Sequence, residues 1–150
     1  MAMTLSGTTG IVLPTGAAPA FSAYRTATQS IASSTWTKIQ YNLEEFDTAN
    51  CYDSTTNYRF TPNVAGYYQI SAGWNNNNNS TWNYISIYKN GSSYKMAIAN
   101  GTNGVGVNIS VLIYFNGTTD YVEAYAVLDG GVINSGSTNT TFTGVLVRSA

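Results

Sequence analysis

The carboxylates are the first side chains to consider for chemistry, because the chain has no histidine to act as a general base or metal ligand. Two carboxylates placed across a glycosidic bond are enough to hydrolyse a sugar. The seven carboxylates are Glu44, Glu45, Asp47, Asp53, Asp120, Glu123 and Asp129. Their spacing singles out no pair, and such side chains at loop edges are usually solvated charges. We therefore expect a protein that is not an enzyme.

Asp47 and Asp53 are the candidates for a metal site. They lie near a predicted turn that also contains Asn50 and Thr55, and Ca²⁺ prefers hard oxygen ligands of this kind. The alternative is that both aspartates cap the turn by accepting backbone hydrogen bonds. We favour capping, and apart from this calcium alternative we expect no cofactor. Cys51 is the only cysteine, so no disulfide can form within the chain.

The strands that must position these side chains are clearest in residues 46–74. Apolar and polar residues alternate in residues 57–61 and again in 67–74, as they do in a strand with one buried face. One face of the second run holds Tyr68, Ile70, Ala72 and Trp74. Pro62 removes a ladder donor and Gly66 permits a positive φ, so the chain turns between the runs. The pattern predicts a β-hairpin with a turn of about five residues.

Similar alternation recurs along the rest of the chain, and no helical period is evident. The further runs are residues 21–26, 36–41, 84–88, 94–99, 105–115, 121–128 and 141–147. Three Asn-Gly pairs, which are strong hairpin signals, separate some of them at Asn90-Gly91, Asn100-Gly101 and Asn116-Gly117. The Ala-rich residues 27–32 are predicted to be a loop. About ten short strands predict an all-β fold, an antiparallel jelly-roll sandwich.

Length and charge limit the other possibilities. At 150 residues the chain fits one domain, which we place at residues 20–150 after an extended N-terminal arm of residues 1–19. Only 9% of residues are charged and the net charge is -1, which disfavours generic nucleic-acid binding. The arm has neither a cationic start nor a long apolar run, so we expect no signal peptide and no membrane insertion.

Residues 46–68 resemble the signature of the complement C1q globular-head family, which shares its jelly-roll fold with tumour necrosis factor. The matching elements are Phe46-Asp47, Tyr52-Asp53-Ser54-Thr55-Thr56, Tyr58-Arg59-Phe60-Thr61-Pro62 and Gly66-Tyr67-Tyr68. Further matches follow in order, so that the resemblance covers about residues 20–148. The chain departs from the family where Gly117 and Asp120 are separated, and no collagen repeat precedes the domain.

The resemblance implies a homotrimer. The chain contains twelve tyrosines, and tyrosine is favoured at interfaces because its ring is buried while its hydroxyl finds a polar partner. We expect Tyr67, Tyr121 and Tyr125 at the trimer interface. The alternative is that most tyrosines fill the sandwich or lie singly on its surface.

The N-terminal arm resembles a different class of protein. Residues 5–14, which read LSGTTGIVLP, are similar to short leader segments of bacteriophage tail-fibre and other structural proteins. This similarity implies that the arm anchors the chain to other virion proteins and that the protein is located in the virion. The expected anchor residues are Leu5, Ile11, Val12 and Leu13.

Ligand contacts are expected from the loops, because loops on a rigid scaffold commonly carry binding specificity. The candidates are Asn77, Asn79, Trp82, Asn100, Asn103 and Asn134. Their amides could bind the hydroxyls of a host-cell glycan or receptor, although the asparagine run 75–79 also fits a solvated loop tip. Two functions stay open: a bacteriophage structural protein, either a receptor-binding tail-fibre tip or a capsid decoration or head fibre, and a secreted or surface C1q-like binding module.

Overall fold

A computed structural model of the chain describes residues 4–6, 10–12, 18–76, 79–101 and 104–150, and every regular element in this part is a β-strand. The strands are β1 (Thr4–Ser6), β2 (Gly10–Val12), β3 (Ala20–Tyr24), β4 (Gln29–Ile31), β5 (Thr37–Lys38), β6 (Leu43–Asp47), β7 (Tyr52–Asp53), β8 (Arg59–Phe60), β9 (Gly66–Asn75), β10 (Trp82–Lys89), β11 (Ser92–Asn100), β12 (Gly106–Phe115), β13 (Val122–Leu128), β14 (Gly131–Ile133) and β15 (Thr141–Ser149). The all-β prediction is therefore confirmed.

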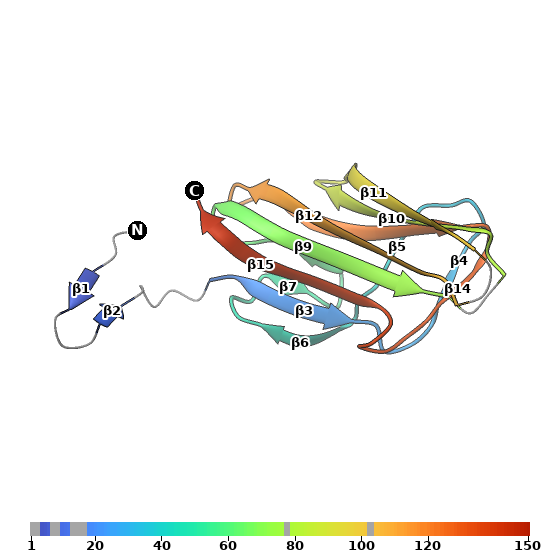
Figure 1. Cartoon of the computed structure of the whole chain (residues 1–150), viewed down its shortest axis with the longest axis horizontal. Coiled ribbons are helices and arrows are strands. Elements are labelled where there is room, and N and C mark those ends of the chain that lie inside the picture. Colours follow the sequence, from blue (N-terminus) through green and yellow to red (C-terminus); the bar gives the residue numbers. More distant parts are fainter. Residues whose placement is uncertain (1–3, 7–9, 13–17, 77–78, 102–103) are drawn as a thin grey trace.

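The strands from β3 onward form a sandwich of two antiparallel sheets (Figure 1). A five-stranded sheet has the order β12-β9-β15-β3-β6. The facing six-stranded sheet has the order β11-β10-β13-β8-β7, with β5 also paired to β13. A small pair, β14 and β4, lies at one end. This arrangement is the predicted jelly roll.

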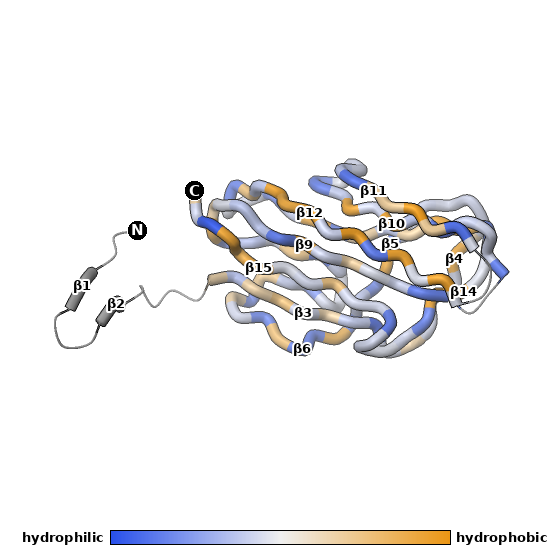
Figure 2. The backbone as a smooth tube through the Cα atoms, viewed as in Figure 1, coloured by the Kyte–Doolittle hydropathy of each residue, from blue (hydrophilic) through white to orange (hydrophobic). Residues whose placement is uncertain are grey.

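Alternation along the strands places the core between the sheets. On β9, Tyr68, Ile70, Ala72 and Trp74 are buried as predicted, while Tyr67 is exposed. Figure 2 shows the same alternation as bands of changing hydropathy along β9 and β12.

Aromatic rings fill the centre of the core. Phe21 on β3 stacks on Tyr52 and Phe60 from the other sheet, with ring centroids 4.8 and 4.5 Å apart. Phe142 on β15 meets Phe21 edge-on at 5.0 Å. Because offset and edge-on pairs of buried rings each contribute about 1 kcal/mol beyond their area, this cluster ties the two sheets together.

The predicted hairpin of residues 57–74 is wrong. β8 pairs with β7 and β13 in the six-stranded sheet, whereas β9 lies in the five-stranded sheet. Residues 61–65 therefore cross between the sheets. Tyr58 has a positive φ of 50°, so it ends the turn before β8 rather than extending that strand.

The three Asn-Gly pairs predicted to be hairpin turns also differ from one another. Asn90-Gly91 closes a two-residue hairpin between β10 and β11, and both residues have positive φ values of 52° and 79°. Asn100-Gly101 and Asn116-Gly117 instead follow strands whose successors lie in the other sheet. Only the first pair is a hairpin turn of the predicted kind.

One smaller expectation is corrected. The Ala-rich residues 27–32, predicted to be a loop, contain β4, which pairs with β14. Phe46, part of the family-like signature, is exposed on β6. In the arm, β1 and β2 pair with each other.

Candidate interaction surfaces

Three loops that are distant in sequence meet at one end of the sandwich, the right-hand end in Figure 1. The Asn134 amide donates to the Asn75 carbonyl at 2.8 Å, and the Gly101 amide donates to the Thr81 carbonyl at 3.2 Å. The Thr81 amide and hydroxyl both donate to Asp129, at 2.9 and 2.7 Å. We call the described residues of the ranges 75–82, 100–105 and 129–135 the loop end.

The loop end brings together four of the predicted ligand-contact residues. Asn79 and Asn100 are exposed, and Asn134 is half-buried against Asn75. Trp82 is the first residue of β10 rather than part of a loop, and it pairs across the sheet with Asn100. Asn77 and Asn103 lie outside the described residues.

A buried polar network supports the loop end, and the sequence analysis did not find it. Asn76 is completely buried and donates through Nδ2 to Oδ1 of Asn83 at 2.5 Å. Asn83 in turn donates to the carbonyls of Ser80 and Ala99. The asparagine run is therefore not uniformly solvated, because its second member fixes the base of the loop.

An aromatic cleft lies beside the loop end, on the outer face of the six-stranded sheet. Its volume is about 280 Å³, and it is lined by Ser34, Trp36, Trp82, Tyr84, Met96 and Val127. The Tyr84 ring lies edge-on to Trp36 and to Trp82, with centroid distances of 6.4 and 5.7 Å. Trp82 is predicted from the sequence to lie in a loop, and nothing in the sequence placed Trp36 beside Trp82 and Tyr84.

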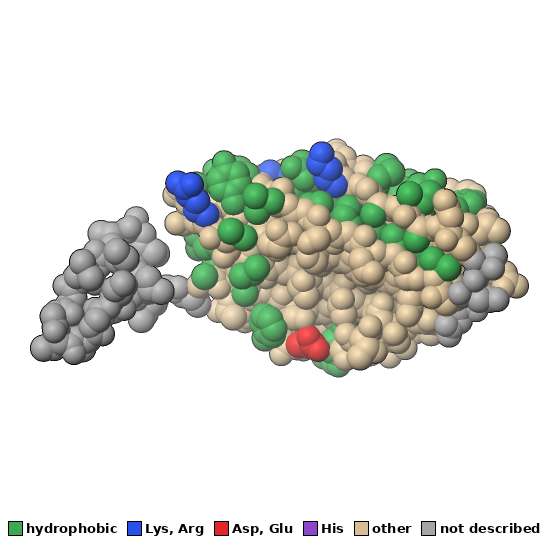
Figure 3. Space-filling view, viewed as in Figure 1, with side chains coloured by type: hydrophobic (Ala, Val, Ile, Leu, Met, Phe, Trp, Pro, Cys, Tyr) green, Lys and Arg blue, Asp and Glu red, His purple; other side chains and the backbone are tan. Residues whose placement is uncertain are grey.

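A second apolar surface, which we call the sheet patch, covers one half of the outer face of the five-stranded sheet. It consists of Tyr67, Leu112, Tyr114, Val145 and Val147. Leu112 and Val145 both pair with Gln69, so they flank it on the same face. Figure 3 shows hydrophobic side chains at the end of the molecule where β12 and β15 end in Figure 1. Leu112 is 55% and Val147 60% exposed.

The other half of this face is polar. Ser110 bonds to Ser71 and accepts from Gln69, both at 2.7 Å. Asn108 covers Gly73, where an added Cβ would come within 1.9 Å of its Oδ1. Between β9 and β12, the apolar side chains are therefore limited to the half that carries the sheet patch, while Leu43 and Phe46 are exposed on the edge strand β6.

The three tyrosines predicted for the trimer interface do not share a surface. Tyr67 belongs to the sheet patch and meets Tyr114 edge-on at 5.4 Å. Tyr125 lies on the six-stranded sheet and stacks on Tyr88 at 4.0 Å. Tyr121 precedes β13, where the Arg59 guanidinium lies 4.4 Å from its ring centroid.

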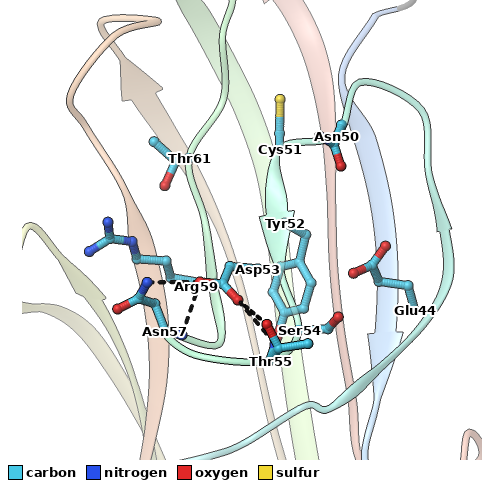
Figure 4. A pocket seen from close by; sticks show the side chains of 10 residues that line it. All are labelled: Glu44, Asn50, Cys51, Tyr52, Asp53, Ser54, Thr55, Asn57, Arg59 and Thr61. Carbon is cyan, nitrogen blue, oxygen red and sulfur yellow. Dashed lines mark hydrogen bonds between the residues drawn. The ribbon is translucent and has the colours of Figure 1, made fainter.

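Asp47 and Asp53 hold turns. Asp47 accepts from the amides of Cys51 and Tyr52 at 2.6 and 2.7 Å. Asp53 accepts from the amides of Thr55, Thr56 and Asn57, as the dashed lines in Figure 4 indicate in part. These hydrogen bonds, led by the Thr56 amide, hold the pKa of Asp53 far below its usual range. Carboxylates directed at N–H donors fit the capping interpretation.

Asp53 borders an open polar depression of about 440 Å³ whose lining also includes Glu44, Cys51 and Arg59 (Figure 4). Cys51 is buried, and burial raises the pKa of its thiol. Within the described part of the chain, no three His, Cys, Asp or Glu side chains are grouped as a metal site requires.

Three further carboxylates are engaged in structural contacts. Glu123 is buried and pairs with Lys38 Nζ at 2.6 Å, and Asp120 pairs with Lys89 at 3.0 Å. Glu45 accepts a hydrogen bond from the Ser22 hydroxyl at 2.6 Å.

Three of the predicted anchor residues, Leu5, Ile11 and Val12, lie in the short ladder of the arm. Leu5 pairs with Ile11, and Val12 pairs with Thr4. Leu13 lies outside the described residues. Among the described residues, no helix is long and apolar enough to cross a membrane.

Comparison with known proteins gives matches by structure. No protein-family model matches the sequence, and no curated protein matches it. The globular domain of zebrafish complement 1qA is 14% identical, with a TM-score of 0.67, and the match covers 89% of this chain and 99% of that one.

Two further structures extend the comparison. Murine APRIL is 6% identical, with a TM-score of 0.70 and coverage of 87% and 99%. The vertex protein P5 of the phage PRD1 is 18% identical, with a TM-score of 0.62 and coverage of 89% and 99%. At these identities the likeness concerns the fold, and it shows that this chain has the C1q/TNF-like jelly-roll fold.

Proposed function

We propose that this chain is a non-enzymatic, homotrimeric structural protein of a bacteriophage virion, either a receptor-binding tail-fibre tip or a capsid decoration or head fibre. Residues 1–19 anchor it, and the opposite end meets the outside. The observation that carries this proposal is the sheet patch, a cluster of exposed apolar side chains on the outer face of the five-stranded sheet.

The sheet patch supports self-association. Exposed clusters of apolar side chains mark protein contact surfaces more often than single exposed residues do. β12 is the edge strand of its sheet and β15 is the central strand. The β12 half of the patch, with Leu112 and Tyr114, can therefore pack on the β15 half of the next protomer. This contact joins two different surfaces of neighbouring protomers. Repeating it from one protomer to the next can close a ring, as a threefold assembly requires.

The positions of the chain ends support an anchor-and-contact arrangement. The Leu146 amide donates to the Pro19 carbonyl and the Ala150 amide to the Ala65 carbonyl, so the chain enters the sandwich near its C-terminus. The loop end lies at the other end of the sandwich in Figure 1. An anchor attached through residue 18 thus leaves the loop end free for an outside partner.

The carboxylates support a non-enzymatic role. Asp47 and Asp53 cap turns, and Glu123 is held in an ion pair with Lys38. A hydrolase needs two carboxylates facing one bound sugar, about 5–10 Å apart, and these side chains instead face backbone amides and a lysine. The structural neighbours are likewise C1q, TNF-like and viral structural proteins.

The experiment that tests the virion role is deletion of the arm. A chain that lacks residues 1–16 should still have the trimer mass but should be absent from purified phage particles, as measured by mass spectrometry. The control replaces residues 1–16 with a Gly/Ser segment of equal length and should also be absent. If particles carried the shortened chain at the normal copy number, the arm would not be the anchor.

A second candidate function is a secreted or surface C1q-like binding module, favoured by the match to the zebrafish C1q domain over 89% of this chain. The same particle analysis separates the two candidates. A virion protein is found at fixed copy number on purified particles, whereas a free module is found only in the soluble fraction.

A further inference from the structure

The aromatic cleft is the concave surface on which this inference rests. Trp36 reaches it from the segment before β5, and Trp82 and Tyr84 reach it from β10. The two edge-on ring pairs, at 72° and 68°, set the Tyr84 ring across both indoles. The Trp36 ring is also tilted against the Tyr88 ring, with centroids 6.2 Å apart. These contacts between the rings fix the positions of the side chains that form the cleft, so the cleft is formed without a ligand.

The side chains of the cleft expose apolar surface that a bound ligand could cover. Trp36 is 36% exposed, and Met96, on the opposite wall, is 58% exposed. Small-molecule pockets are mostly apolar and aromatic, with a few polar groups that fix orientation, and a volume of about 300 Å³ is at their lower limit. The size of the cleft fits one small ring.

The polar groups around the cleft are neutral donors and acceptors. The Ser34 hydroxyl lies in the lining, and Asn100 lies directly across from Trp82 on β11. Asp129 belongs to the loop end but not to the lining of the cleft, and its Oδ2 accepts hydrogen bonds from Thr81. No Lys, Arg, Asp or Glu is among the described lining residues. An anionic ligand would therefore lack a counter-charge, and the lining fits a neutral one. Aromatic faces also attract cations, which is why the test below includes a cationic probe.

We propose that the aromatic cleft between Trp36 and Trp82 binds a neutral sugar residue of a cell-surface glycan. A pyranose has one face of C–H groups, which carry partial positive charge and suit the negative face of an aromatic ring. Its hydroxyls meet Ser34 and the amides of the adjoining loop end. The inference rests on the proposed function, in which the loop end faces an outside partner, and it names the ligand class and the site.

The test is an NMR titration of the full chain that follows the indole N–H signals of its three tryptophans. The probes are the methyl glycosides of glucose, galactose, rhamnose and N-acetylglucosamine, with choline chloride as a cationic probe. We expect saturable shifts of the Trp36 and Trp82 signals with at least one glycoside and a dissociation constant of about 1 mM or weaker. Trp74 is 1% exposed in the core, so its signal should not move.

Variants assign the effect to the cleft. Trp36→Ala should weaken glycoside binding at least about tenfold, whereas Trp36→Phe, which keeps a ring, should retain part of it. Phe46→Ala is the matched control, because Phe46 is a 51% exposed aromatic residue on the other sheet, and it should bind like the parent chain. Circular dichroism confirms that each variant is folded.

Three results would overturn the inference: no shift with any glycoside, shifts with choline alone, or unchanged binding in folded Trp36→Ala. Light scattering on the same samples reports the trimer independently. A trimer that is present on particles and binds no glycoside would remove the sugar site and leave the proposed function standing. A monomer that binds glycoside would contradict the proposed function and leave the sugar site standing.

Discussion

At Asp53, one carboxylate accepts from three successive backbone amides, those of Thr55, Thr56 and Asn57, and from the Asn57 side chain at 2.8 Å. The Tyr52–Asp53 strand β7 and the Arg59–Phe60 strand β8 are joined by this turn. A residue that looks like a metal ligand in the sequence is therefore a residue that holds two short strands in register.

Replacing this carboxylate gives a prediction with a pH signature. Asp53→Asn should lower the free energy of unfolding at pH 7 by about 1 kcal/mol, as expected for the loss of a capping side chain. The pKa of Asp53 is lowered in the folded state, so its contribution is complete above the unfolded pKa of about 3.9 and is lost as pH falls toward the folded pKa. The difference between variant and parent should shrink below about pH 4.

Urea unfolding at a series of pH values measures this difference. Glu45→Gln is the control, because it removes the same charge from β6, where the partner is a single hydroxyl on Ser22. A difference between Asp53→Asn and the parent chain that stays constant from pH 7 to pH 2 would contradict the capping role.

At the scale of elements, the connections between sheets matter as much as the strands. Gly117, in the connection from β12 to β13, has a φ of +72°, and an added Cβ would lie 2.4 Å from the Ala65 amide nitrogen. Gly117 thus combines a left-handed backbone with close approach to the connection that joins β8 to β9. The two crossings are packed against each other at this point.

Two glycines allow these effects to be separated. Gly104 also has a positive φ, +66°, but no atom lies within 4 Å of the position of its Cβ. Gly104→Ala should cost only the backbone strain, about 1 kcal/mol. Gly117→Ala adds a clash with backbone and should cost at least about 2 kcal/mol in total. Urea unfolding at equal protein concentrations measures both, and equal losses would contradict the packed crossing.

The strands were largely predictable from sequence, and their partners were not. Alternation is a local property, so the buried face of β9 could be identified from Tyr68, Ile70 and Trp74. Whether a turn returns the chain to the same sheet or to the facing one depends on contacts made far along the chain. That is why Asn90-Gly91 formed the predicted hairpin while residues 61–65 crossed between sheets.

The candidate surfaces were predictable in part for the same reason. The loop end could be anticipated, because Asn79, Asn100 and Asn134 lie in turn-rich segments. The aromatic cleft could not, because Trp36 and Tyr84 are brought together only by the pairing of β5 and β10 with β13. Leu112 and Val145 in the sheet patch likewise meet only across β9.

At the scale of the whole molecule, the sheet patch and the aromatic cleft lie in different regions. The sheet patch covers the outer face of the five-stranded sheet near the C-terminus, and the aromatic cleft lies on the opposite sheet near the loop end. Burying the sheet patch in a trimer would leave the cleft accessible, so self-association and ligand binding can occur together.

A charge in the sheet patch should break the trimer. Leu112→Lys places an ammonium group at the proposed contact, where burying it without a partner is costly. Phe46→Lys is the matched control, since Phe46 is exposed to a similar degree on β6, the opposite edge strand of the same sheet. Leu112→Lys should be a folded monomer, and Phe46→Lys should keep the mass of the parent chain.

The measurement that tests the central claim most directly is the mass of the unmodified protein by sedimentation equilibrium at micromolar concentration. The account predicts three times the 16.1 kDa mass of the chain, without dissociation on moderate dilution. A mass near 16.1 kDa would contradict it, because the sheet patch would then be exposed to solvent in the native protein.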